Sequence, residues 1–436
     1  MSQEYWEKDI ETISRKELEK MQFDRLKKTL EVALQSDYYK NIFKKEKLTI
    51  DSFKDINDVK MIPLTTKDNL HDHFPYGFLA VDKKEVIRLH SSSGTTGNPI
   101  VVFHSRHDLG SWANLVARSM FAVGVRNTDV FQNICGYGLF TGGLGFQYGA
   151  EKLGTLTIPA GMGNSKRQIK LMRDFGTTVI HTIPSYVRHL VDQFHDLNLE
   201  LGTDSDLRLM IIGAEPHTEE TRRYIEQMIG VKAFNSYGIS EMNGPGVAFE
   251  CEYQHGLHLW EDSFLMEIIN PETLDPVADG EIGELVLTTL DRQAMPILRY
   301  STHDLTRIIP GVCPCGRTHR LIDRIKGRTD DMIIIRGCNV FPMQIEKVLV
   351  QIPELESNYL ITLETIDGVD EMIIEVEAKE AIIMDTFSKL EKLKKYIIDE
   401  VRNEVLISPK VKLVEPNHFL PCEGKALRVK DNRKQY

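Results

Sequence analysis

The sequence lacks the marks of a secreted or membrane-spanning protein. It has six cysteines in 436 residues, too few for a scaffold held together by disulfides. No apolar run reaches the length of a membrane-spanning helix, and the opening residues MSQEYWEKDI have no apolar core like that of a signal peptide. We therefore expect a cytoplasmic protein with reduced cysteines and no membrane partner.

An excess of positive charge is also absent. Lysine and arginine number 53 against 64 aspartate and glutamate residues, which gives a net charge of −11. Such a charge disfavours nucleic acid and anionic membranes as the main partner. The hydrophobic fraction of 42% is ordinary for a globular protein, and the length exceeds that of one typical domain. We expect small-molecule partners, and any nucleotide must be bound by local donors, cations or Mg²⁺.

Alternating apolar runs and amphipathic stretches predict an α/β fold for most of the chain. Residues 1–48 have leucines at helical spacing. Further along, apolar runs that end in glycine or proline alternate with helical patterns closed by glycine. The predicted strands lie in 155–160, 177–184 and 207–216, and the predicted helices in 164–176 and 218–230. This alternation is typical of layered α/β structure with a largely parallel sheet.

The pattern changes toward the C-terminus. Residues 279–290 read as a strand of an antiparallel hairpin, and a boundary is predicted near residue 327. Beyond it the predicted elements are a strand at 332–335, a helix at 343–351, strands at 357–362 and 371–378, and a helix at 384–404. We therefore predict two domains, a large N-terminal α/β domain (1–327) and a small C-terminal α+β domain (328–436).

The stretch SSSGTTGNP at 91–99 has the composition of a phosphate-binding loop. It differs from the Walker A loop, because Asn98 and Pro99 follow Gly97 where that motif needs lysine, and the next residues, IVVFHS, read as a strand and not a helix. A strand–loop–strand arrangement can still hold a phosphate with backbone N–H groups and hydroxyls. A serine- and glycine-rich surface turn is the alternative.

Residues downstream favour the phosphate-binding interpretation. Tyr237 in NSYGISE could stack on a base, and Glu241 in the same segment offers an oxygen ligand for Mg²⁺. Asp304 in RYSTHDL could bind a ribose diol. Arg328 lies at the predicted domain boundary, and Lys425 follows a glycine in PCEGKALRV. Each signal alone is weak, but the five in this order form a specific pattern.

Together these segments resemble the adenylate-forming superfamily of acyl-CoA synthetases and adenylation domains. The motifs SSSGTTGNP, GAEP, SYGISEMNGPG, CPCGRTHRLIDRIKGRTDDMIIIRGCNVFP and EGKALRV narrow the resemblance to its phenylacetate–CoA ligase branch, over nearly the whole chain. One departure is Cys422 and Glu423, where relatives usually carry a basic or hydroxyl pair before the glycine.

The resemblance implies a reaction. An arylacetic acid would be ligated to coenzyme A at the expense of ATP, through an acyl adenylate, with release of AMP and pyrophosphate. Two alternatives stay open: an adenylyltransferase that acts on another aryl acid or a cofactor without coenzyme A, and a non-enzymatic nucleotide-binding protein. The oligomeric state also stays open, and a homodimer is compatible with the sequence.

The resemblance also assigns roles to residues. Lys425, Glu241 and Ser240 would be catalytic, with Glu241 holding Mg²⁺ and Ser240 contacting the α-phosphate. The β- and γ-phosphates would lie on Ser93, Gly94, Thr95, Thr96 and Gly97. The adenine would lie between Gly213, Ala214, Glu215 and Pro216 on one side and Asn235, Ser236, Tyr237 and Gly238 on the other. Asp304 and Arg328 would bind the ribose, and a mobile C-terminal domain that carries Lys425 would turn about a hinge at Asp330.

The glycine- and aromatic-rich stretch 136–154 is the predicted acid pocket. Tyr137, Phe140 and Phe146 could line a flat apolar slot, although each could equally be a core residue. The resemblance favours phenylacetate as the substrate, with a substituted or indolic relative next.

The cysteines suggest a metal site. Cys313 and Cys315 in CPCG, together with Cys251 and His258, would supply three thiolates and one imidazole, a ligand set for structural Zn²⁺. His255 and His319 are rival ligands, and reduced, buried cysteines without metal are the alternative. The remaining cysteines are interpreted as structural: Cys135, Cys338 and Cys422.

Overall fold

The computed structural model describes residues 4–91, 99–201, 203–336, 338–366, 369–383, 387–416, 418–419 and 428–433. Two predicted site segments, Ser93–Gly97 and the stretch containing Cys422 and Lys425, lie outside the described residues. The α-helices are α1 (Lys8–Glu11), α2 (Arg15–Ala33), α3 (Asp37–Lys45), α4 (Lys67–Asp72), α5 (Arg106–Ala122), α6 (Thr141–Leu153), α7 (Ser165–Asp174), α8 (Pro184–Asp196), α9 (Glu219–Ile229), α10 (Pro342–Leu349), α11 (Glu380–Ile383) and α12 (Phe387–Val405).

The strands form one sheet of nine strands, two sheets of four strands and two hairpins. They are β1 (Arg88–Ser91), β2 (Val101–His104), β3 (Val130–Asn133), β4 (Leu156–Ile158), β5 (Val179–Thr182), β6 (Leu209–Gly213), β7 (Lys232–Ile239), β8 (Gly244–Glu250), β9 (Leu257–Leu259), β10 (Phe264–Ile269), β11 (Gly283–Thr289), β12 (Tyr300–Thr306), β13 (Ile308–Ile309), β14 (Leu321–Ile322), β15 (Gly327–Arg328), β16 (Ile333–Ile335), β17 (Cys338–Val340), β18 (Leu355–Ile366), β19 (Val369–Ala378), β20 (Lys410–Val414) and β21 (Val429–Asp431).

The largest sheet has nine strands in the order β13-β14-β9-β8-β7-β6-β5-β3-β4. Strands β4, β3, β5, β6 and β7 run parallel, and the remaining pairs are antiparallel. Leu209 and Ile211 pack with α5 and α6, whereas Met210 and Ile212 pack with α7, α8 and α9. Because helices cover both faces, β6 is a continuous apolar run buried along its whole length.

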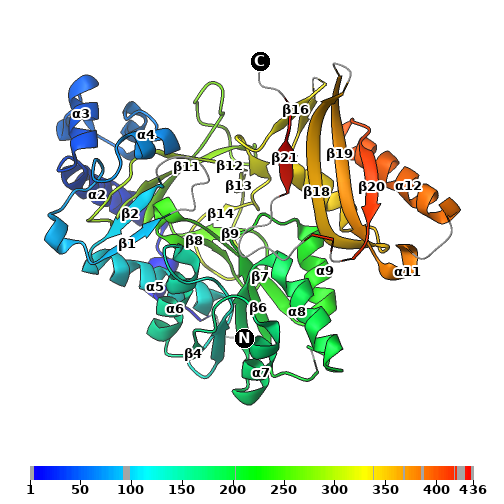
Figure 1. The fold of residues 1–436 in the computed structure, drawn as a ribbon. Helices are drawn as coiled ribbons and strands as arrows, with labels where there is room; N and C mark the ends of the chain where they lie inside the picture. The colour runs from blue at the N-terminus through cyan, green and yellow to red at the C-terminus, as the bar shows by residue number, and fades with distance from the viewer. Residues whose placement is uncertain are drawn as a thin grey trace.

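A second sheet, in the order β10-β11-β12-β15, packs beside the first (Figure 1). The hairpin β1–β2 and the N-terminal helices share one hydrophobic core with it, which includes Leu26, Phe103, Trp260 and Leu287. The predicted phosphate-binding segment falls between β1 and β2, largely outside the described residues. The strand predicted directly after that segment is confirmed as β2.

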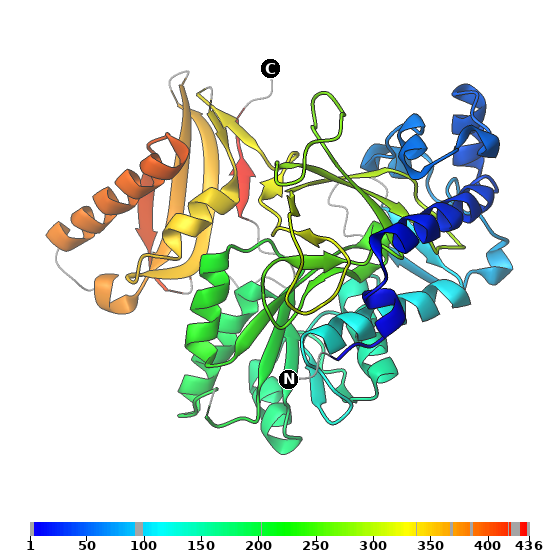
Figure 2. The ribbon, with the colours of Figure 1, turned by 180° about the vertical axis from the view of Figure 1, so that it is seen from behind.

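The C-terminal part of the chain has its own core. Strands β20-β19-β18-β21 form a sheet, and α10 and α12 pack on it through residues such as Ile345, Ile361, Ile374 and Val401. Helix α12 and the N-terminal helix α2 lie at opposite ends of the molecule (Figure 2). No helix in the described part of the chain is long and apolar enough to cross a membrane.

The predicted fold class, a layered α/β part followed by a small α+β part, is confirmed. The helix predicted at 218–230 is α9, and Gly230 ends it in the left-handed conformation at φ 72°. The strand predicted at 357–362 is wrong in length, because β18 extends from Leu355 to Ile366. Its long antiparallel pairing with β19 supports residues that the apolar pattern alone does not mark.

Two glycines let the strands approach closely where β6 and β7 end. A Cβ on Gly213 would lie 2.3 Å from Ser236 Oγ, and one on Gly238 would lie 1.9 Å from the Gly244 carbonyl oxygen. Neither position leaves room for alanine. The Gly244 carbonyl oxygen beside Gly238 and the Ser236 carbonyl oxygen beside Gly213 belong to the backbone and cannot rotate away.

We predict that Gly238→Ala lowers the melting temperature by several degrees, since the β7–β8 hairpin must open to accept the methyl group. The matched control is Gly110→Ala on the exposed face of α5, where nothing lies within 4 Å of the added Cβ. That change should stabilise the helix by up to about 1 kcal/mol. Calorimetric melting of both variants tests the prediction, and equal melting temperatures would contradict it.

Candidate active site

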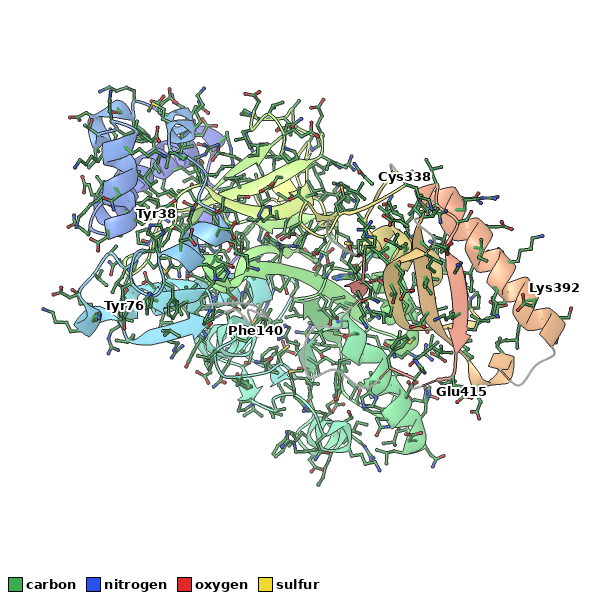
Figure 3. The ribbon with its side chains drawn as sticks, turned by 45° about the horizontal axis from the view of Figure 1, so that its top comes forward. Tyr38, Tyr76, Phe140, Cys338, Lys392 and Glu415 are labelled. Carbon is green, nitrogen blue, oxygen red and sulfur yellow. The ribbon has the colours of Figure 1, made fainter. Side chains whose placement is uncertain are left out.

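A cavity of about 660 Å³ lies where the parallel strands end, between the large sheet and the C-terminal sheet. Its walls come from the segments that follow β3, β5, β6 and β7, and from α10 and β18 across the gap. The carboxyl ends of parallel strands are the usual ligand-binding edge of an α/β sheet. Figure 3 shows Phe140, one of the lining residues, near the middle of the molecule.

The GAEP segment forms one wall. Ala214 has φ 64°, a conformation that costs energy in a residue with a side chain and that often marks a functional site. Glu215 accepts hydrogen bonds from Ser185 N (3.1 Å) and Ser185 Oγ (2.9 Å) at the start of α8. Of the residues predicted to flank an adenine, Ala214, Glu215, Pro216, Ser236 and Gly238 line the cavity. The other three, Gly213, Asn235 and Tyr237, lie outside its lining.

Asp304, on the second sheet, contacts the nine-stranded sheet through Tyr237 and the strand before the C-terminal part through Arg328. It accepts a hydrogen bond from Tyr237 Oη (2.6 Å) and an ion-paired one from Arg328 Nη1 (3.0 Å). Arg328 also donates to both oxygens of Asp330, each at 2.8 Å. Partial burial opposes ionisation of Asp330, but the guanidinium outweighs it and lowers the pKa of this carboxyl. The predicted ribose-binding residues and the predicted hinge residue therefore lie in one connected network.

Ser240 and Glu241 form a short turn after β7 and line the same cavity. Tyr300 Oη donates to Glu241 Oε1 at 3.0 Å, and burial together with this carboxylate raises the pKa of Tyr300 well above its ordinary value. Arg292 donates to the Glu241 carbonyl, and burial lowers the Arg292 pKa to about 10, so the side chain stays charged at neutral pH. Ser240 Oγ lies 3.3 Å from Thr141 Oγ1. The predicted magnesium ligand is thus a buried, oriented carboxylate.

The end of the cavity beyond Ser240 is apolar. Phe140 and Phe146 line it with Pro184 and Pro245, but Tyr137 does not. The Tyr137 hydroxyl instead accepts a hydrogen bond from Asn133 Nδ2 (3.0 Å) behind the wall. In its place the cavity is lined by Cys135 and His181, both buried.

Polar contacts hold the C-terminal part against the large part. Arg188 of α8 forms an ion pair with Glu356 of β18, and Thr221 Oγ1 donates to Glu346 Oε1 at 3.1 Å. Tyr359 donates to the other Glu346 oxygen at 3.0 Å. These contacts are hydrophilic, whereas the cores on either side are separate. An interface of this kind can open without exposing a hydrophobic core.

Three of the cysteines and one histidine form a cluster away from the cavity. The ligand atoms of Cys251, His258, Cys313 and Cys315 all lie within 4.8 Å of one another, and all four residues are buried. Cys251 Sγ lies 3.5 Å from Cys313 Sγ, and Cys315 Sγ lies 3.3 Å from His258 Nε2. In a tetrahedral zinc site with Zn–S bonds of about 2.3 Å, neighbouring ligand atoms are about 3.5–3.8 Å apart. The spacing and ligand types fit that ion.

The rival histidines are not part of this cluster. His255 is exposed, and both ring nitrogens of His319 have other partners. His319 Nδ1 accepts from Glu261 N at 3.0 Å, and Nε2 donates to the Ile10 carbonyl at 3.0 Å. His258 Nδ1 donates to the His319 carbonyl at 3.1 Å, which leaves Nε2 directed at the thiols. This hydrogen bond to the His319 carbonyl orients the ring as metal-binding histidines require.

Several site residues carried no usable signal in the sequence. Tyr300 and Arg292 reach Glu241 from segments more than 50 positions away, and Thr141 reaches Ser240 from a segment 99 positions away. His181 lies at the end of a strand that reads as ordinary core. Tyr300 lies within the RYSTHDL segment and Thr141 within the stretch 136–154, so these two had neighbours that could have drawn attention to them.

Comparison with known proteins gives consistent matches. The family of AMP-binding enzymes matches residues 26–290, and the AMP-binding enzyme C-terminal domain matches residues 337–433. The chain is 42% identical over 429 residues to the phenylacetate-coenzyme A ligase of Escherichia coli K12, which covers 97% of each chain.

Two solved structures of 2-hydroxyisobutyryl-CoA ligase are similar to the fold. The postadenylation state, in complex with R3-HIB-AMP, gives a TM-score of 0.92 at 26% identity and covers 98% of this chain and 92% of the other. The thioesterification state, in complex with 2-HIB-AMP and CoA, gives a TM-score of 0.73 at 27% identity and covers 99% and 93%.

The burial of His181 should make the stability of the protein depend on pH. Burial lowers the pKa of His181 to about 3, whereas an exposed imidazole titrates at about 6.5. As the pH falls through this window the unfolded chain binds a proton that the folded protein does not bind. The free energy of unfolding should therefore decrease as the pH is lowered, by about 1.4 kcal/mol per pH unit for this one group.

Melting curves of the wild type, His181→Gln and the exposed-residue control His195→Gln at pH 7 and pH 5 test this. We expect a smaller loss of melting temperature on acidification in His181→Gln than in the other two. An equal loss in all three proteins would show that His181 does not contribute.

Proposed function

The chain belongs to the AMP-binding enzyme family, and from this membership we propose that it ligates phenylacetate to coenzyme A. The enzyme is an AMP-forming acid–CoA ligase that acts through an acyl adenylate. The observation that carries the substrate proposal is one continuous cavity whose apolar end, lined by Phe140 and Phe146, adjoins Ser240 and Glu241. A flat aromatic acid fits such an end, and its carboxylate would then face the nucleotide side.

The first half-reaction joins the acid to AMP. A carboxylate oxygen attacks the α-phosphorus, the bond to the bridging oxygen breaks, and pyrophosphate leaves. Both reactants are anionic, so donors and cations aimed at the developing charge lower the barrier. We assign this task to Lys425 and Ser240, and the holding of the β- and γ-phosphates to Ser93–Gly97. A Mg²⁺ ion held by Glu241 would neutralise phosphate charge.

The nucleotide would lie along the wall formed by the strand ends. We assign the adenine to Gly213–Pro216 and Asn235–Gly238, and the ribose hydroxyls to Asp304 and Arg328. The support is that five of the eight adenine-side residues line the cavity and that Asp304 and Arg328 already form one network. Asn235 and Tyr237 would act from behind the wall, Tyr237 through its hydrogen bond to Asp304.

The second half-reaction replaces AMP by a thiol. The coenzyme A sulfur attacks the acyl carbon, the carbon–oxygen bond to AMP breaks, and the thiol proton is released. We propose that residues 328–436 move as a domain relative to residues 1–327, with Asp330 as the hinge. The separate C-terminal core and the polar contacts at Arg188 and Thr221 support this. A further support is that the fold is more similar to the postadenylation state of 2-hydroxyisobutyryl-CoA ligase than to the thioesterification state of the same enzyme.

We further propose that Zn²⁺ binds Cys251, His258, Cys313 and Cys315, where it would act structurally and not in the reaction. The loop that carries Cys315 is joined to the N-terminal segment, since Arg317 pairs with Glu11 at 2.6 Å and Tyr5 donates to the Cys315 carbonyl. Metal binding would thus secure the N-terminal segment as well as the loop. A cytoplasmic location and a homodimer stay predictions.

On the substrate, we predict a higher kcat/KM for phenylacetate than for acetate, benzoate or a long-chain fatty acid. Phe140 and Phe146 offer an aromatic ring an apolar contact that acetate cannot make. Product analysis with and without coenzyme A separates a ligase, which forms a thioester, from an adenylyltransferase. A fatty acid as the best substrate would contradict the proposal.

The half-reactions should respond differently to two variants. Lys425→Ala should slow adenylation by roughly two to three orders of magnitude, the scale of losing one transition-state donor, and spare thioester formation from a synthetic acyl adenylate. Asp330→Pro fixes φ at the hinge and should impair mainly thioester formation. Asp330→Asn is the control, because it weakens the pair with Arg328 but leaves the backbone free. Equal loss of both steps in both variants would leave the hinge without support.

For the metal, we predict about one zinc per chain in protein purified without chelators. Cys313→Ser should lower the melting temperature more than it changes KM, because a closed site contributes to folding. His255→Gln, which alters the excluded rival ligand, should keep its zinc. Elemental analysis that finds no zinc or other transition metal would overturn the assignment.

A further inference from the structure

His181 lines the cavity beside Phe146. Its neighbours determine which of its two ring nitrogens carries the proton. Asn133 Nδ2 donates to the Tyr137 hydroxyl (3.0 Å) and to the Gly143 carbonyl (2.7 Å). With its amide nitrogen so engaged, Asn133 presents Oδ1, an acceptor, to His181 Nδ1 at 2.9 Å. His181 therefore carries its proton on Nδ1, and Nε2 is left as an acceptor.

The partner of that acceptor is a weak one. Cys135 Sγ lies 3.8 Å from His181 Nε2, and a thiol is a poor hydrogen-bond donor. Burial raises the pKa of Cys135 to about 12, so the thiol keeps its proton and remains a donor. Cys135 and His181 both line the cavity. A ligand group in the cavity that donates more strongly can replace this contact.

The imidazole is also held in place by a neighbouring aromatic ring. The Phe146 ring lies 3.7 Å from the His181 ring, centroid to centroid, with the two planes tilted by 31°, and both residues are buried. This close ring contact and the Asn133 bond at Nδ1 leave the imidazole little freedom to turn. The acceptor direction is therefore set before any ligand enters, which reduces the cost of forming one specific hydrogen bond.

We propose that His181 is a specificity-determining residue that selects arylacetic acids with a hydrogen-bond donor on the ring. The donor, a phenolic hydroxyl or an indole N–H, would be bound by His181 Nε2 in place of the Cys135 thiol. This inference rests on the proposed function, because it places the aromatic ring against Phe140 and Phe146. It goes further by naming the substituent that this wall prefers.

The test compares matched acids that differ only in the donor. Hydroxyphenylacetates with the hydroxyl at ring position 3 or 4 are compared with the corresponding fluorophenylacetates, which are similar in size but cannot donate. We expect kcat/KM for thioester formation to favour hydroxyl over fluorine by about five- to tenfold at one ring position, the scale of one net hydrogen bond. Fluorine equal to or better than hydroxyl at both positions would overturn the inference.

Variants assign the preference to a residue. His181→Leu should abolish the hydroxyl preference, measured as the ratio of kcat/KM for the hydroxyphenylacetate to kcat/KM for the matched fluorophenylacetate in the same variant. His181→Gln, which retains an acceptor oxygen, should keep part of it. Cys135→Ala removes the competing thiol and should preserve or increase the hydroxyl preference. If His181→Leu does not fold, this variant tests whether the ligand replaces the thiol at His181 Nε2. An unchanged preference in His181→Leu, or a lost one in Cys135→Ala, contradicts the assignment. Failure of all arylacetates would instead refute the proposed function.

Discussion

The buried carboxylate of Asp304 is the constraint on which the site depends. A buried charge is expensive unless it is paired and hydrogen-bonded, and here Tyr237 and Arg328 satisfy its two oxygens. Tyr237 belongs to the nine-stranded sheet, Asp304 to the second sheet, and Arg328 to the strand that leads to the C-terminal part. Arg328 also pairs with Asp330, the proposed hinge residue. The guanidinium that satisfies Asp304 therefore also holds the backbone that leads to the C-terminal part. In the proposed reaction, ribose hydroxyls that bind Asp304 would compete with these donors, which would couple nucleotide binding to the hinge.

The division of the hydrophobic cores explains how such a coupling can act. Residues from Ile333 to Ile407 form one core, and the large part has its own. The contacts between the two parts, Arg188 with Glu356 and Thr221 with Glu346, are polar. Polar groups can exchange protein partners for water at low cost, whereas separating two halves of one apolar core would expose it. In the proposed reaction, this wall of the cavity would be removed and replaced between the two half-reactions.

Local patterns allowed much of the fold and part of the site to be predicted from the sequence. Apolar runs that end in glycine identified β6, and the glycine after α9 identified where that helix ends. The cluster of three cysteines and one histidine was predicted because thiols and imidazole have few alternative uses in combination. The choice of His258 over His319 depended on which ring nitrogens were already bonded. Tyr137 was wrongly expected in the cavity, because its hydroxyl is bound by Asn133. His181, Arg292 and Tyr300 were missed, since their contacts join distant segments and depend on the packing of strands.

In the proposed mechanism, the two parts change their arrangement between the half-reactions. The most direct measurement is the distance between fluorophores placed at Lys170 on α7 and at Lys392, which lies on α12 at the outer edge of the C-terminal part (Figure 3). Both positions are exposed, and labels on unnatural amino acids avoid the native cysteines. We expect one distance with a non-hydrolysable acyl-adenylate analogue alone and a clearly different one after coenzyme A is added. A single distance under both conditions, in protein that forms the thioester, would contradict the proposed mechanism.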